Sequence, residues 1–131
     1  MKKGVVVTGG SHGIGKAMCK EFYNKGYQVC FIDINKDGEL MEKDNLYYFY
    51  GDIKDKDVLK KFYEFCIEKM GRIDILINNA CYGKGGILNN ASYEDFDEVL
   101  SVGVKAPYEL SRLCKDELIK NKGRKYNSEI K

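Results

Sequence analysis

The stretch "VVVTGGSHGIGKA" at residues 5–17 passes from an apolar run through a cluster of glycines into a helical pattern. Val5 to Thr8 is β-branched and uninterrupted, which is typical of a strand buried on both faces of a sheet. Glycines let backbone N–H groups approach a ligand closely, and the start of a helix favours negative charge. The stretch therefore predicts a central strand followed by a phosphate-binding loop.

Two kinds of phosphate loop compete for these glycines. Residues 10–16, GSHGIGK, fit the spacing GxxxxGK, in which the lysine reaches the outer phosphates of a nucleoside triphosphate. That loop also needs a serine or threonine hydroxyl after the lysine to hold Mg²⁺. The sequence has Ala17 there, so it disfavours a triphosphate and favours a dinucleotide.

The rest of the chain alternates strand-like and helix-like segments. Further strands are expected over 28–33, 46–53 and 73–79, and helices over 14–25, 56–70 and 93–118. A loop with at most a short helix is expected at 35–45, and a glycine-rich loop at 80–91. Alternating strands and helices build a parallel sheet covered on both faces, which predicts an α/β, doubly wound, Rossmann-type fold.

Composition excludes several classes of function. The 131 residues carry a formal net charge of +2, which gives no reason to expect binding to nucleic acid or to an anionic membrane. No apolar run reaches membrane-spanning length. His12 is the only histidine, so neither a histidine-based triad nor a metal site is expected. The five cysteines show no metal-ligand spacing and favour free thiols in a cytoplasmic protein.

Three further landmarks follow the glycines in order: Asp33 at the end of the second strand, "GDI" at 51–53 and "NNA" at 78–80. With "TGGSHGIG" at 8–15, which matches TGxxxGxG, they make residues 4–124 resemble the short-chain dehydrogenase/reductase family. The resemblance implies the strand order 3-2-1-4 and a dinucleotide cofactor. It assigns the cofactor contacts to Gly9, Ser11, His12, Gly13, Ile14, Gly15, Asp33, Asp52, Ile53, Asn79 and Ala80.

The resemblance also bears on the choice of cofactor. A carboxylate at Asp33 would accept hydrogen bonds from the adenosine ribose and repel a 2′-phosphate. Relatives that prefer NADP often carry an arginine where this sequence has His12, so NAD is the expected cofactor. Cys81 stands where the family pattern NNAG has its glycine, and a buried, unreactive thiol is expected there.

The residues that perform the family's chemistry are not found. Family members transfer a hydride with help from a Tyr-x-x-x-Lys pair and a serine. The only match to that pair, Tyr50 and Lys54, spans a strand end and is not expected to share a helix face. Ser128 is out of register with the family serine. No catalytic residue is therefore assigned.

We accordingly expect an incomplete sheet, without the fifth and later strands of the family. Residues 1–124 would form the dinucleotide-binding half, and residues 125–131 a polar tail introduced by a truncation or a frameshift. The expected function is the cofactor-binding portion of an alcohol/carbonyl oxidoreductase, inactive as this polypeptide. A stand-alone nucleotide-binding or regulatory module and the nonfunctional product of a broken reading frame remain alternatives. The complete form is expected to be a homo-oligomer.

Gly103 occupies the position where the family has an asparagine that supports a proton-relay water. Pro107, four residues later, has no N–H to give to the Gly103 carbonyl, which predicts a kink and an unpaired carbonyl. One hypothesis is that this carbonyl holds the water in place of the asparagine side chain. A kink with only a structural role is the alternative.

Overall fold

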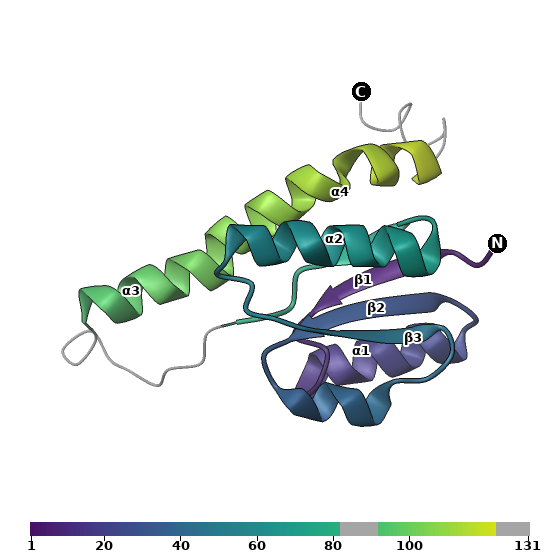
Figure 1. Cartoon of the computed structure of the whole chain (residues 1–131), viewed down its shortest axis with the longest axis horizontal. Coiled ribbons are helices and arrows are strands. Elements are labelled where there is room, and N and C mark those ends of the chain that lie inside the picture. Colours follow the sequence, from purple (N-terminus) through teal and green to yellow (C-terminus); the bar gives the residue numbers. More distant parts are fainter. Residues whose placement is uncertain (82–91, 123–131) are drawn as a thin grey trace.

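The computed structural model describes residues 1–81 and 92–122, which form one sheet with helices on both of its faces (Figure 1). Three regions of the sequence analysis lie outside the described residues. They are positions 82–91 of the expected loop, the boundary after residue 124, and the tail that contains Ser128.

The sheet has four parallel strands in the order β3-β2-β1-β4, so the predicted fold class and strand order are confirmed. All five residues of β1 are buried, which explains why its sequence is apolar without alternation. The strands are β1 (Gly4–Thr8), β2 (Gln28–Asp33), β3 (Leu46–Tyr50) and β4 (Ile75–Ile77).

Helix α1 (Gly13–Asn24) and the short 3-10 helix η1 (Lys36–Met41) lie on one side of the sheet (Figure 1). Helices α2 (Lys56–Met70) and α4 (Ala106–Lys122) lie on the other. Because strand side chains alternate between faces, each strand contributes to two cores. Val5, Val7 and Phe31 pack on the α1 side, and Val6, Cys30 and Ile32 on the α2 side.

The helix ends follow the signals in the sequence. Asp55 caps α2 by accepting a hydrogen bond from the Asp57 amide, and Gly71 ends the helix in the left-handed region at φ 76°. Ser92 starts α3 (Tyr93–Leu100) with a capping box closed by Asp95. Both predicted helix starts are therefore confirmed.

Two strands are shorter than predicted. β3 ends at Tyr50 and not at Ile53, because Asp52 forms a turn in which its carboxylate accepts a 3.0 Å hydrogen bond from the Lys54 amide. β4 covers only Ile75–Ile77 of the predicted 73–79. Before it, Asp74 accepts a hydrogen bond from the Gly4 amide, and after it Asn79 turns toward β1.

The face of α1 that meets the sheet also differs from the prediction. Ile14 is the first apolar residue of the helical pattern over residues 14–25, which predicts it on the buried face, but it is 70% exposed, whereas Gly15 and Cys19 are buried. A four-residue periodicity in so short a helix fits more than one face. The close approach of α1 to β1 selects the face with the small residues.

The long helix is interrupted by η2 (Ser101–Lys105), a π-helical turn between α3 and α4. The Ala106 amide donates to the carbonyl of Ser101, five residues earlier, instead of to that of Val102. The interruption predicted from Gly103 and Pro107 is thus present as a widened turn.

Candidate functional site

A cavity of about 430 Å³ lies at the carboxyl ends of the strands. It is bordered by the segments that follow β1, β2, β3 and β4, which meet at one edge because the strands are parallel. We call it the strand-end pocket. All predicted cofactor residues except Ser11 and Gly15 line it: Gly9, His12, Gly13, Ile14, Asp33, Asp52, Ile53, Asn79 and Ala80.

Two glycines allow the loop to close tightly over β4. Gly9 has φ 73°, and a Cβ built there would lie 3.0 Å from the Ala80 Cα. A Cβ on Gly15 would collide with the Gly9 carbonyl and the Asn79 side chain. Gly15 therefore shapes the site from behind the loop, where no atom can be added, and does not line the pocket.

Thr8 and Asn79 hold this loop to the end of β4. The Thr8 hydroxyl oxygen accepts hydrogen bonds from the amides of Asn79 and Ala80, both at 3.0 Å. The Asn79 side chain donates to the carbonyls of Thr8 at 3.2 Å and Gly9 at 3.1 Å. Sequence reasoning did not assign a role to Thr8, although it is the first residue of the TGxxxGxG pattern.

The amino-terminal end of α1 faces the pocket without a side-chain cap. His12 is the N-cap residue in an extended conformation, and it makes no capping hydrogen bond. Helices α2 and α3 by contrast each have a side-chain acceptor at this position. The first amides of α1 thus remain available to an anionic ligand.

Asp33 is fixed where the second strand leaves the sheet. One carboxylate oxygen accepts a 3.0 Å hydrogen bond from the Ser11 amide, and the other accepts one of 3.0 Å from the Asn35 amide. This arrangement ties the glycine loop to the end of β2. Burial raises the pKa of the Cys19 thiol to about 12, and the negative charge of Asp33 adds to this shift.

Lys54, Asp52 and Glu98 line the strand-end pocket and form two ion pairs that the sequence analysis did not predict. The Lys54 ammonium lies 2.9 Å from Glu98 and 3.5 Å from Asp52, so it joins the segment after β3 to α3. Its hydrogen bond to Glu98 raises the pKa of Lys54. Residues 44 positions apart carry no local signal of such a contact.

The two residues of the Tyr50–Lys54 match to Tyr-x-x-x-Lys each contact other side chains in the structure. The Lys54 ammonium is engaged by Glu98, while the Tyr50 ring has the Lys36 ammonium 5.5 Å from its centre. Cys81 also departs from the expectation, because it is exposed and lines the pocket. The absence of the family glycine at this position therefore leaves a thiol accessible at the pocket.

Gly103 lies in the π-helical turn and is exposed. In an α-helix the Gly103 carbonyl would accept from residue 107, which is a proline and has no N–H. Val102, next to it, is buried and lines the strand-end pocket. The turn thus changes the backbone hydrogen bonding beside the pocket, while the role of the Gly103 carbonyl in holding a water stays a prediction.

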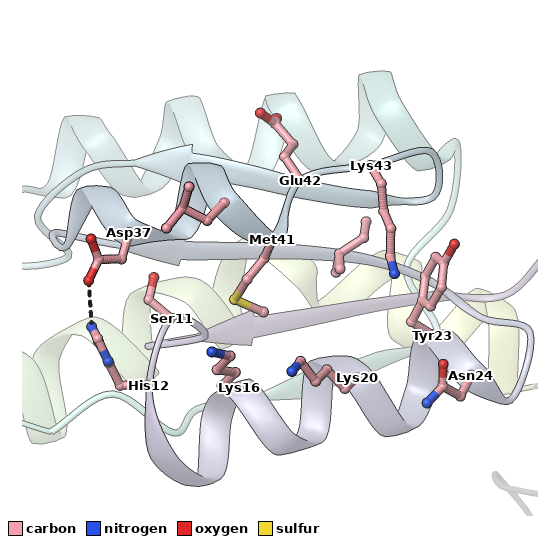
Figure 2. Close-up of a pocket in the computed structure, with 12 residues that line it drawn as sticks. Ser11, His12, Lys16, Lys20, Tyr23, Asn24, Asp37, Met41, Glu42 and Lys43 are labelled. Atoms are coloured by element: carbon pink, nitrogen blue, oxygen red, sulfur yellow. Dashed lines mark ion pairs between the residues drawn. The ribbon is translucent and has the colours of Figure 1, made fainter.

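Ser11 faces a second cavity. The Ser11 amide donates a hydrogen bond to the Asp33 carboxylate, while the Ser11 side chain lines a cavity between α1 and η1 (Figure 2). Only His12 lines both this cavity and the strand-end pocket. The predicted loop residues are therefore divided between two neighbouring spaces.

A parallel sheet in the order 3-2-1-4 with a glycine loop leading into an uncapped helix is typical of the Rossmann fold, the fold of many dinucleotide-binding proteins. The chain belongs to the short chain dehydrogenase family, whose model matches residues 3–125. The resemblance seen in the sequence is thereby confirmed.

Individual relatives agree with this assignment. An uncharacterized oxidoreductase of Thermotoga maritima is 34% identical over 130 residues, covering 92% of this chain and 50% of its own. An apo SCOR enzyme from Clostridium thermocellum is 59% identical with a TM-score of 0.87, covering 95% of this chain and 52% of that one.

Two similar structures contain a cofactor, and the cofactors differ. The 3-ketoacyl-(acyl-carrier-protein) reductase from Brucella melitensis, complexed with NADH, is 28% identical with a TM-score of 0.85 and covers 91% of this chain and 51% of that one. A metagenomic short-chain oxidoreductase complexed with NADP is 28% identical with a TM-score of 0.81, at 90% and 57% coverage. The chain spans about half the length of the relatives that it matches.

Within residues 1–81 and 92–122, no helix combines the length and the apolar character that a membrane crossing requires. The same residues contain no group of three or more His, Cys, Asp or Glu side chains arranged to hold a metal ion.

Proposed function

We propose that this chain is the dinucleotide-binding portion of an NAD(P)-dependent oxidoreductase that acts on an alcohol/carbonyl pair. The observation that carries the proposal is the convergence of the glycine loop, Asp33, Asp52 and Asn79 around one cavity of about 430 Å³. That volume lies in the range of ligand pockets, about 300–1,000 Å³. The bound nicotinamide would supply hydride transfer.

Each wall of the pocket has a chemistry suited to one part of the cofactor. The uncapped amides at the start of α1 fit the diphosphate, and Asp33 fits the hydroxyls of the adenosine ribose. Asp52 and the buried Ile53 fit the adenine. Ala80 and Cys81 border the part of the pocket that would receive the nicotinamide half.

NAD is proposed in preference to NADP. The Asp33 carboxylate is held by two backbone amides where the adenosine ribose would lie. A 2′-phosphate there would place like charges together in a partly buried site, which is unfavourable. Among the glycine-loop residues that line the pocket, His12 alone has a polar side chain.

We further propose that this polypeptide binds cofactor without turnover. Its one Tyr-x-x-x-Lys match is split between two other interactions, as described above. The complete form would assemble as a homo-oligomer, and the five free thiols fit the cytoplasm. A stand-alone nucleotide-binding module remains the second candidate, supported by the intact pocket in a chain without an assigned catalytic residue.

Calorimetric titration of the purified chain with NAD, NADP and ATP–Mg²⁺ tests the proposal. We expect saturable binding of NAD at millimolar or lower concentration, and weaker binding of NADP. Asp33→Asn should weaken NAD binding about tenfold, because a charge-assisted hydrogen bond contributes about 1.5 kcal/mol or more. Asp44→Asn, an exposed carboxylate outside the pocket, is the matched control.

Three outcomes would contradict the proposal. A folded chain that binds no dinucleotide would rule out the cofactor role. Tighter binding of ATP–Mg²⁺ than of NAD would revive the triphosphate interpretation of the loop. NADP binding as tight as that of NAD, unchanged by Asp33→Asn, would remove the argument for cofactor preference.

A further inference from the structure

Tyr48, in the middle of β3, connects the sheet to the segment that follows β2. It is 8% exposed and packs in the core on the α1 side of the sheet. Its hydroxyl group donates a 2.8 Å hydrogen bond to the carbonyl of Asn35, and the carbonyl of Asp33 lies 3.4 Å from the same oxygen. A buried side chain of β3 thus holds the backbone on both sides of Ile34.

The Tyr48 hydroxyl acts as the donor in this contact. A carbonyl is only an acceptor, so the phenol must keep its proton for the hydrogen bond to form. Burial raises the pKa of Tyr48, and the negative charge of Asp33 adds to this shift. The hydroxyl is therefore protonated at neutral pH, and the hydrogen bond to Asn35 is kept.

Packing fixes the position of the Tyr48 ring. Gly38 of η1 lies so close to the ring that a Cβ built on Gly38 would collide with it. The ring centre of Phe31 lies 5.3 Å from that of Tyr48, and Phe31 in turn leaves no space for a side chain at Gly10 of the glycine loop. Because these neighbours leave the ring little freedom, the hydroxyl has one well-defined place.

Asn35 transmits the contact to the Asp33 carboxylate. The Asn35 amide donates a 3.0 Å hydrogen bond to one carboxylate oxygen of Asp33, and the Ser11 amide donates to the other. The Asn35 side chain accepts a 2.9 Å hydrogen bond from the Asp37 amide, which starts η1. Movement of the Asn35 backbone would therefore remove one of the two amides that orient the carboxylate.

We propose that Tyr48 is a positioning residue for the choice of cofactor, because its hydroxyl fixes the turn at Asn35 and thereby the orientation of the Asp33 carboxylate. The inference rests on the proposed function, in which Asp33 binds the hydroxyls of the adenosine ribose. Each carboxylate oxygen can accept a second hydrogen bond, so both stay available to the ribose. A carboxylate that is already oriented binds two adjacent hydroxyls with a smaller loss of entropy.

The same orientation opposes a 2′-phosphate. A carboxylate held by two amides does not turn away from a phosphate at the ribose 2′ position, so the like charges stay close together. Without the Tyr48 hydroxyl, the Asn35 backbone is free to move and the carboxylate is free to turn. NAD then binds more weakly, and the penalty against NADP becomes smaller. Loss of the hydroxyl therefore changes the ratio of the two affinities, which a purely structural role would leave unchanged.

Calorimetric titration of the full chain and of Tyr48→Phe with NAD and with NADP tests the proposal. The substitution keeps the ring and removes only the hydroxyl. We expect the ratio of the NAD affinity to the NADP affinity to fall about threefold to tenfold, the range that one hydrogen bond contributes. Tyr47→Phe is the matched control and should keep the ratio. Tyr47 packs on the other face of the sheet, and its hydroxyl has no hydrogen bond within residues 1–81 and 92–122.

Amide hydrogen exchange of the ¹⁵N-labelled chain without dinucleotide gives a second readout. The Asn35 amide should exchange at least about threefold faster in Tyr48→Phe than in the unmodified chain, because its hydrogen bond to Asp33 opens more often. Gly38→Ala should produce the same changes in exchange and in the affinity ratio, since the added Cβ displaces the Tyr48 ring.

Four results would contradict the inference, and they separate it from the proposed function. A folded Tyr48→Phe chain that binds NAD with an unchanged affinity ratio would refute the role of Tyr48 alone. An equal change of the ratio in Tyr47→Phe would show that the effect is not specific to the Asn35 contact. Unchanged exchange of the Asn35 amide would show that Tyr48 does not hold the turn. If the unmodified chain bound neither dinucleotide, the proposed function would fail, and the choice of cofactor with it.

Discussion

Replacing Thr8 by valine tests the contact that holds the glycine loop to β4. Valine keeps the β-branched shape of threonine in a residue that is 3% exposed, but it removes the hydroxyl oxygen. The amides of Asn79 and Ala80, which both donate to that oxygen at 3.0 Å, then lose their acceptor. Thr8→Ser keeps the oxygen and removes only the methyl group.

The size of the effect follows from these two amides. An orphaned buried donor costs about 1–3 kcal/mol, and both amides are part-buried, so Thr8→Val should lower the free energy of unfolding by about 2–3 kcal/mol. For a chain of this size that corresponds to a fall in Tm of about 6–15 °C. Loss of one methyl group in Thr8→Ser costs about 1 kcal/mol.

Thermal unfolding followed by circular dichroism, with NAD titration of each folded variant, measures both consequences. We expect the order of stability unmodified chain, Thr8→Ser, Thr8→Val, and the weakest NAD binding in Thr8→Val. If Thr8→Val were as stable as the unmodified chain, or if Thr8→Ser were the more damaging change, the hydroxyl would not hold the loop.

Three further predictions concern the same region and the base of the sheet. Gly15→Ala should weaken NAD binding, measured by calorimetry, at least tenfold, because the added Cβ would collide with the Gly9 carbonyl. Gly103→Ala is the control and should leave NAD binding unchanged, because no atom lies within 4 Å of its Cβ. Cys81 alone should react rapidly with a thiol reagent and be protected by NAD, while the four buried cysteines react only on unfolding; a second fast thiol would contradict this. Burial of Asp74 raises its pKa, but hydrogen bonds from Arg72 and the Gly4 amide outweigh burial and leave that pKa below 3.8. Its stabilisation is thus present above pH 3.8 and lost as the pH falls through the lower, folded-state value. Urea unfolding at several pH values should show this loss, and Asp74→Asn should flatten it.

The sequence predicts those parts of the fold that depend on local chemistry. The apolar run of β1 is visible in consecutive residues, and the caps at Asp55 and Ser92 and the stop at Gly71 satisfy backbone groups within a few residues; the structure has all of them. The predicted ends of β3 and β4 were wrong, because the strand ends depend on turns and on cross-strand contacts, such as the hydrogen bond of Asn79 with Thr8.

In the candidate site, too, features with a local sequence pattern could be predicted, whereas contacts between distant segments could not. Glycine spacing locates the loop, since only a residue without Cβ allows the packing at Gly9 and Gly15. The Lys54–Glu98 pair joins distant segments and has no local pattern. The hydrogen bond from Tyr48 to the Asn35 carbonyl likewise joins residues 13 positions apart and has no local pattern.

The widened turn at Ser101–Lys105 also fixes the rotational phase of the long helix. An α-helix advances about 100° per residue, so one residue added or deleted in this turn would rotate α4 about its axis by more than a quarter turn relative to α3. Glu98 on α3 borders the strand-end pocket, while Leu110 and Cys114 on α4 pack with α2. The number of residues between these positions is therefore constrained as strictly as their identity, and the segment should tolerate substitutions better than insertions or deletions.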